Sequence, residues 1–225
     1  MKNKFISILN NISNEKKLIE ELYIKLENIY TFENRFYHSL DHINSIISDL
    51  DSKWERYTMD GLLGKTYSEM ELDKDSIYRC LFLATWFHDA VYTPGLNSNE
   101  IDSADLAASE LQKLNFPEKQ IKIICELILS TISHRPILDN GICKIFLDLD
   151  LAILGKDSEI YNKYCKNIRK EYSFVEQKDY SEKRIEILSN FLKRDKLFYT
   201  TEFQDQYEVK ARNNMSLEIQ ELSVV

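Results

Sequence analysis

The sequence predicts an all-α protein, a single compact helical bundle over residues 1–225. Helix-breaking residues are scarce, with five glycines and three prolines in 225 residues, well below the roughly 12 per cent of average usage. Apolar residues recur at three- and four-residue intervals along most of the chain, which is the period of an amphipathic helix. A chain of this length can bury one sizeable core, so we expect one domain of long helices.

The first clear helical pattern covers residues 13–30, with Ser13 as the expected N-cap. The apolar residues of its expected buried stripe are Leu18, Leu22, Leu26 and Ile29. A second helix is expected from about Ser39 or Asp41 to Leu50. Residues 52–74 contain two of the five glycines and lack a clear period, so we expect an excursion between core helices there.

The segment SIYRCLFLATWFH, residues 76–88, is apolar nearly all round and predicts a central helix packed on every side. Two amphipathic helices should follow, from Ser98 or Asn99 to Leu114 and from Pro117 onward. Their expected inward faces are Ile101, Ala104, Ala107, Ala108 and Leu111, then Ile121, Ile124, Cys125, Ile128 and Leu129.

The segment GICKIFLDLDLAILG, residues 141–155, predicts either a short buried helix or a strand, because periodicity does not separate the two for a short apolar run. Further helices are expected at about 157–171, 179–195 and 204–222.

Composition restricts the partners and the compartment. The formal net charge is −8 and lysines and arginines do not cluster, which argues against a nucleic-acid duplex as partner. The four cysteines lie far apart without a Cys-x-x-Cys pair, as expected of buried free thiols in a reducing compartment. The apolar run near the N-terminus is too short for a signal peptide or a membrane span. We therefore expect a cytoplasmic protein with no membrane partner.

Several polar residues lie beside apolar helical segments, so we expect folding to bury them, and buried polar groups require a partner. The four histidines of the chain are His38, His42, His88 and His134. His88 and Asp89 close the most hydrophobic segment, in WFHDAVY, and Asp150 lies within another apolar run. Buried carboxylates are costly unless a cation gathers them, and imidazole with carboxylate suits Zn, Mn, Fe or Ni. The alternative is that each histidine is a core residue bonded to a backbone carbonyl.

The order of a His, a His-Asp dipeptide and a later Asp resembles the HD superfamily of metal-dependent phosphohydrolases. The fragments RFYHSLDHI, WFHDAVY, NEIDSADLA, TISH, LDLDLAILG, IRKEY and ARNN together resemble one branch of it, a bacterial family of HD-type hydrolases whose substrate is not established. The likeness covers most of the chain outside residues 52–74. It implies an all-helical fold of the HD-domain and phosphodiesterase type, with four ligands around one ion.

The resemblance implies a ligand set for one divalent ion, which could be Mn, Mg, Co, Ni, Zn or Fe. Carried over residue by residue, the ligands are His42, His88, Asp89 and Asp150. Asp150 is favoured over Asp148 because Leu and Ala follow it, much as Leu or Arg-Leu follows the family's last Asp. Asp148 would then support the site or the fold.

The first ligand has two mappings. YHSLDHINSII resembles the Tyr-His-Asn-x-x-His stretch of cyclic-nucleotide phosphodiesterases, which makes His42 the ligand and His38 the general acid. RFYHSL resembles an Arg-x-x-His-Ser-Leu form, which would make His38 the ligand.

Four residues are expected to bind substrate: Arg35, His134, Glu100 and Arg169. A guanidinium matches phosphate geometry, and Arg35 lies beside the site in sequence, whereas Arg169 better suits an ordinary salt bridge, to Glu171 or elsewhere. His134 suits a second metal, a phosphate oxygen or a helix C-terminus. Glu100 suits either a site role or the N-terminal charge of a helix.

The resemblance implies an enzyme that hydrolyses a phosphate ester or anhydride of a small nucleotide-like substrate. Asp89 would take a proton from water and His38 would give one to the leaving oxygen. The sequence has neither the His-Asp-x-x-Glu of related nucleotide monophosphate hydrolases nor the Gly-Tyr-Pro of cyclic-di-GMP enzymes, so those activities lose support. Two alternatives are an HD-type di-iron oxygenase and a non-catalytic, metal-stabilised module that senses a nucleotide.

Overall fold

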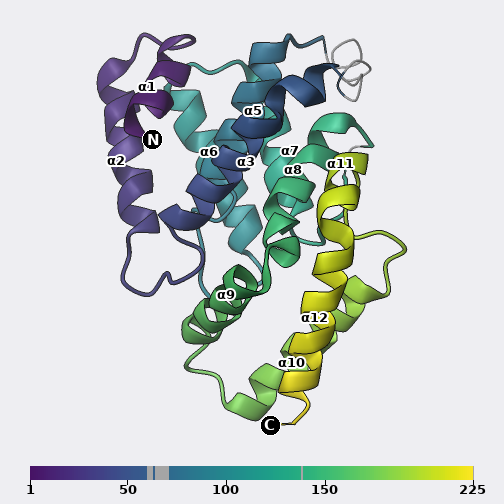
Figure 1. Ribbon diagram of the computed structural model, residues 1–225. Helices are drawn as coiled ribbons and strands as arrows, with labels where there is room; N and C mark the ends of the chain where they lie inside the picture. Colours follow the sequence, from purple (N-terminus) through teal and green to yellow (C-terminus); the bar gives the residue numbers. More distant parts are fainter. Residues whose placement is uncertain (60–62, 64–70, 138, 225) are drawn as a thin grey trace. The chain divides into compact units, whose positions relative to one another are not determined.

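The computed structural model describes residues 1–59, 63, 71–137 and 139–224. All regular secondary structure in these residues is helical (Figure 1), which confirms the prediction of an all-α protein. The chain forms two compact units, Met1–Phe146 and Leu147–Val225, and the division falls inside one helix. The prediction of a single domain stays a prediction beside this division.

The first unit is built around a central buried helix. Its helices are α1 (Lys2–Asn10), α2 (Lys16–Tyr30), α3 (Leu40–Met59), α5 (Lys74–Phe87), α6 (Asn99–Lys113), α7 (Glu118–Ser130) and the start of α8 (Gly141–Leu151). Every residue from Cys80 to Phe87 of α5 is buried, because α3, α6 and α7 all pack against this helix. The prediction of a central helix packed on every side is confirmed.

Two features of the N-terminal helices differ from the prediction. The helix α1 was not predicted, and its Phe5 is fully buried with its ring 5.2 Å from that of Trp86. Ser13 is not the N-cap of α2, which begins at Lys16; its hydroxyl accepts the Glu15 amide instead.

The buried stripe of α2 includes Leu22 and Leu26, as predicted, but it is turned toward residues that were not predicted. Leu18 is 36% exposed, whereas Ile19, Tyr23 and Tyr30 are buried. The rings of Tyr23 and Tyr30 pack edge-on against Trp86, and burying these large rings sets the rotation of the helix.

The predicted excursion at 52–74 is wrong for its first eight residues, because α3 continues to Met59 instead of ending at Leu50. Residues 60–62 and 64–70 lie outside the described residues, so the rest of this prediction falls largely there. The helix α5 begins at Lys74, two residues earlier than expected, because the Asp73 carboxylate caps it by accepting the Ser76 amide at 2.7 Å.

The inward faces of α6 and α7 also differ in part. Ile101 of α6 is 47% exposed, while the polar residues Asn99 and Ser103 are buried. Cys125 and Leu129 of α7 are only partly buried. Because α7 packs against both α5 and α6, it buries a broader face, which also includes Ile123 and Leu127.

The ambiguous segment 141–155 is helical, as α8 followed by the short 3-10 helix η1 (Ala152–Gly155). The second unit continues with α9 (Ser158–Glu171), α10 (Gln177–Leu192), α11 (Thr201–Phe203), the π-helical turn η2 (Gln204–Glu208) and α12 (Val209–Leu222). The single helix expected at 204–222 thus begins with one π turn, and α12 follows it. Helices α10 and α12 pack along each other.

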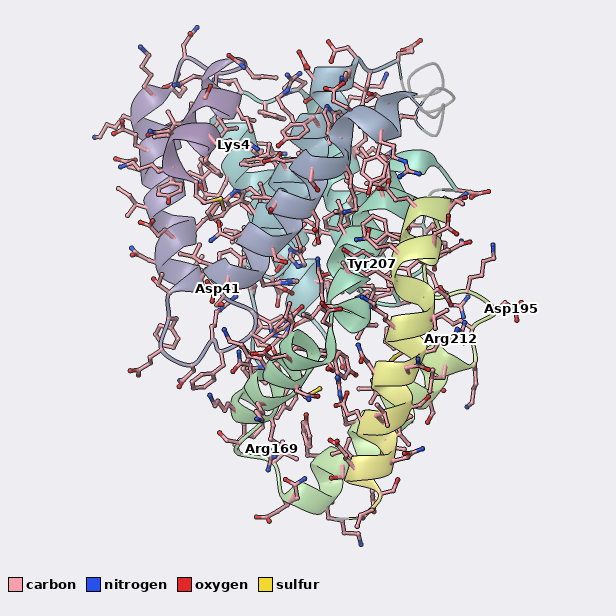
Figure 2. All side chains as sticks on the ribbon, in the orientation of Figure 1. Lys4, Asp41, Arg169, Asp195, Tyr207 and Arg212 are labelled. Carbon is pink, nitrogen blue, oxygen red and sulfur yellow. The ribbon has the colours of Figure 1, made fainter. Side chains whose placement is uncertain are left out.

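Polar side chains of α12 fasten the second unit by binding carbonyl oxygens. The Arg212 guanidinium, labelled in Figure 2, donates to the carbonyls that end α10, those of Leu192, Arg194 and Asp195. Asn214 donates to two carbonyls around η1. The ARNN fragment therefore has a structural explanation within this unit.

The four cysteines are free. Cys80 and Cys143 are buried, as expected, whereas Cys125 and Cys165 are partly exposed. Among the described residues, no helix combines the length and hydropathy needed to cross a lipid bilayer.

Candidate metal centre

His88 and Asp89 lie at the end of α5, where the chain leaves the helix. Phe87 is the last helical residue, and the His88 amide still donates to the Ala84 carbonyl at 2.9 Å. His88 still has helical backbone angles, φ −58° and ψ −36°. The His88 Nε2 and the Asp89 Oδ2 are separated by 3.0 Å.

His42 joins them from the first turn of α3. Its Nε2 lies 3.3 Å from the His88 Nε2 and 3.8 Å from the Asp89 Oδ2. Both histidines are buried, at 6% and 2% exposure, whereas the Asp89 side chain keeps 19% of its surface exposed. The side chains of these three residues therefore lie together, and their role as metal ligands stays a prediction.

The hydrogen bonding of His88 fixes which of its ring nitrogens carries a proton. Its Nδ1 lies 2.9 Å from the Thr85 carbonyl oxygen, which can only accept, so Nδ1 carries the hydrogen. A neutral His88 then directs the bare Nε2 lone pair at the Asp89 carboxylate, which is also an acceptor. Two acceptors at 3.0 Å repel each other unless a proton or a cation lies between them.

The charge of Asp89 points the same way. Burial by itself raises the pKa of this carboxyl, but its interactions with the His88, His38 and His42 imidazoles outweigh burial and hold the pKa well below its usual range. The carboxylate is therefore ionised, and it is a suitable ligand for a divalent cation.

The spacing of the three atoms fits one metal ion. Atoms separated by 3.0, 3.3 and 3.8 Å lie on a circle with a radius of about 2.0 Å. A point about 2.1 Å from each atom therefore exists, and this is the usual length of a bond from a divalent metal to imidazole nitrogen or carboxylate oxygen.

Asp150 lies in the last turn of α8, the helix whose Phe146 packs edge-on against the His88 ring. The division between the two compact units falls after Phe146, so Asp150 belongs to the second unit. Its role as a fourth ligand stays a prediction.

Asp148, the alternative to Asp150, has both carboxylate oxygens engaged. The amides of Tyr199 and Thr200 donate to Oδ1 and Oδ2, each at 2.7 Å. Burial raises the pKa of Asp148 to about 7, although these N–H donors lower it. The side chain is completely buried and ties α8 to the segment before α11.

His38 precedes α3, which begins at Leu40, so His38 and His42 do not share a helical face. Their ring centroids are 6.3 Å apart. The His38 ring packs against Tyr92, at 4.1 Å between centroids, and the His42 ring packs against Tyr37 at 4.7 Å. Aromatic rings therefore lie next to the histidines of this site. The ligand atoms of His42, His88 and Asp89 are called the three-atom group below.

The Arg35 guanidinium binds backbone oxygens. Nη1 donates to the carbonyls of Asp89 at 2.6 Å and His38 at 3.3 Å, and Nη2 donates to the Ala90 carbonyl at 3.0 Å. Its predicted role in binding phosphate stays a prediction.

The other expected substrate residues lie apart from the three-atom group in sequence. Arg169 belongs to the second unit, where it donates to the carbonyls of Tyr172 and Val175 and to the Gln177 side chain. His134 lies in the turn after α7 with a left-handed backbone, φ +46°. Glu100 is in the first turn of α6 and partly exposed. Their substrate roles stay predictions.

Two polar residues of the NEIDSADLA fragment hold the loop after Asp89, a role the sequence did not reveal. The Ser103 hydroxyl accepts the Val91 amide at 3.0 Å and donates to the Val91 carbonyl at 3.1 Å. The Asn99 side chain bonds both the amide and the carbonyl of Thr93. Asn99, Ser103 and Ala107 follow one another at four-residue intervals, which places the two polar residues on the inward side of α6, and this spacing was the available signal.

Comparison of the chain with family models, with curated proteins and with solved structures finds no match.

Proposed function

We propose that the protein is a metal-dependent phosphohydrolase with an HD-type fold. It would hydrolyse an ester or anhydride of phosphate in a small nucleotide-like substrate. The carrying observation is the convergence of the His42, His88 and Asp89 ligand atoms within 3.0 to 3.8 Å of one another.

The ligand set consists of two imidazoles and two carboxylates, with Asp150 as the fourth ligand. This set accommodates Mn, Mg, Co, Ni, Zn or Fe without selecting one. The Thr85 carbonyl supports the assignment, because it fixes the His88 tautomer that presents a bare Nε2.

A divalent ion held by these residues would supply Lewis acidity, which would lower the pKa of water and polarise a phosphoryl oxygen. The ionised Asp89 carboxylate would accept a proton from the attacking water. His38, which electrostatically contacts Asp89, would donate a proton to the leaving oxygen, a contribution of about 10²- to 10⁴-fold in rate. The rings of Tyr37 and Tyr92 beside the histidines offer surfaces on which a base or sugar can stack.

The free thiols support a location in a reducing compartment. Four free cysteines suit a reducing environment, and we place the enzyme in the cytoplasm.

The test is a screen of phosphorylated metabolites with Mn, Mg, Co, Ni, Zn and Fe added one at a time. We expect phosphate release with at least one metal, and none from Asp89→Ala under the same conditions. Full turnover by the Asp89→Ala enzyme would contradict the assignment. Two Fe per chain together with O₂ uptake would instead establish the oxygenase, and stabilisation by a nucleotide without product would establish a sensing module.

A further inference from the structure

Arg35 joins the two chain segments that carry the metal-centre residues. One of its acceptors, the His38 carbonyl, lies just before α3 and His42; the other two, the carbonyls of Asp89 and Ala90, lie in the turn after α5. Both hydrogens of Nη1 are used, one toward each segment. A single side chain thereby sets how closely these segments approach.

The surroundings hold the guanidinium in this orientation. It lies between two aromatic rings, 5.2 Å from the centroid of Tyr30 and 5.5 Å from that of Tyr92, a favourable arrangement for a cation. Tyr30 is itself anchored, because its hydroxyl donates to the Trp86 carbonyl at 2.9 Å. The carbonyls at the end of α5 also carry the negative end of the helix dipole, which attracts a positive charge.

We propose that Arg35 is a positioning residue of the metal centre, which holds His42 and Asp89 at the separation that one cation requires. The inference rests on the proposed metal function, and it assigns Arg35 a role in metal affinity instead of phosphate binding. The His42 and Asp89 ligand atoms are 3.8 Å apart, the longest side of the three-atom group. This is the distance that would grow if the two segments separated.

A lysine side chain cannot reproduce the hydrogen bonds that Arg35 makes to the three carbonyls. Its ammonium is a single point with three donors, whereas the three carbonyls are bonded by two nitrogens of a rigid planar group. If Arg35 acted only through its positive charge at the end of α5, Arg35→Lys would keep the function. If Arg35 holds the two segments together, Arg35→Lys would lose it.

The experiment measures Co²⁺ affinity by calorimetry, and the absorption spectrum of the Co²⁺-loaded protein, in Arg35→Lys and Arg35→Ala. We expect affinity to fall about 10- to 100-fold in both variants, as is typical when a group supporting metal ligands is removed, with a changed spectrum. The matched control is Arg212→Lys, since Arg212 also bonds three carbonyls at the end of a helix. It should lose stability while keeping its Co²⁺ affinity and spectrum.

Inorganic phosphate separates the two roles of Arg35. Unchanged Co²⁺ affinity in folded Arg35→Lys, with weaker binding of inorganic phosphate, would overturn the inference and restore the phosphate role, while leaving the metal centre intact. If the parent protein does not bind Co²⁺, the proposed function and this inference both fail. Circular dichroism establishes whether each variant is folded. If Arg35→Ala is not folded, the comparison uses Arg35→Lys alone.

Discussion

The second unit contains a buried ion pair whose removal should be costly. Arg184 of α10 bonds Glu218 of α12 through Nε at 2.8 Å and Nη2 at 3.2 Å. The two side chains are only 10% and 7% exposed. The Tyr161 hydroxyl donates to the same carboxylate, and the Tyr164 hydroxyl accepts from the same guanidinium. We consider the substitution Glu218→Gln, which keeps the shape and removes the charge.

Helix α10 also contains a matched control, the pair of Lys183 and Glu186, in which Lys183 is next to Arg184. Lys183 and Glu186 are also 2.8 Å apart, but their side chains are 68% and 57% exposed. Removing one partner of a buried pair costs about 3 to 5 kcal/mol, because it leaves a charge without compensation. An exposed pair contributes about 0 to 1 kcal/mol. Because the two pairs have the same separation and differ in burial, Glu218→Gln should lower the free energy of unfolding several-fold more than Glu186→Gln.

The assay is urea unfolding of both variants followed by two signals. The two tryptophans, Trp54 and Trp86, both lie in the first unit, so their fluorescence reports that unit, whereas far-ultraviolet circular dichroism reports the whole chain. We expect Glu218→Gln to lower the circular-dichroism midpoint markedly and Glu186→Gln to leave it nearly unchanged. Losses that agree within about 1 kcal/mol would refute the reasoning from burial.

Three further substitutions test other parts of the structure. Gly155→Ala should destabilise by about 1 to 3 kcal/mol, measured by thermal unfolding, because an added Cβ would collide with the backbone of Tyr207; an unchanged midpoint would contradict this packing. Ser103→Ala should cost about 1 to 3 kcal/mol in urea unfolding, since it leaves the amide and carbonyl of Val91 without their partner; a loss below the error of the measurement would count against the loop anchor. Burial raises the pKa of the Cys80 thiol from 9.0 to about 12, so its contribution to stability is complete below pH 9 and declines as the pH rises toward 12, by about 1.4 kcal/mol per pH unit. Cys80→Ala should therefore show a shallower loss of stability between pH 9 and 10 than the parent, and equal slopes would contradict the assignment.

The helical elements were predictable because their signals are local. The scarcity of glycine and proline and the apolar period identify most helices, and the uniform apolarity of 80–87 identifies the central one. The rotation of α2 was not predictable, because it depends on Tyr23 and Tyr30 packing against Trp86. Such contacts join residues that are distant in sequence, and no periodicity records them.

The residues of the candidate metal centre were predictable because imidazoles and carboxylates beside apolar helices need compensation. The residues that hold these ligands in place were not predictable. Thr85 acts through its backbone carbonyl, which any residue would provide, and Arg35 acts on carbonyls that carry no sequence signature. Asp148 and Asp150 look alike in the sequence, and only the amides of a distant segment distinguish them.

The most direct test of the metal centre is calorimetric titration of Co²⁺ into the parent and into Asp89→Asn, with Asp41→Asn as control. Asp41 is an exposed carboxylate next to His42 on α3 (Figure 2), so it matches the charge change without touching the three-atom group. We predict one Co²⁺ per chain for the parent and the control, and affinity weakened at least 100-fold for Asp89→Asn. Equal affinity in all three proteins, or none in the parent, would contradict a cation held by His42, His88 and Asp89.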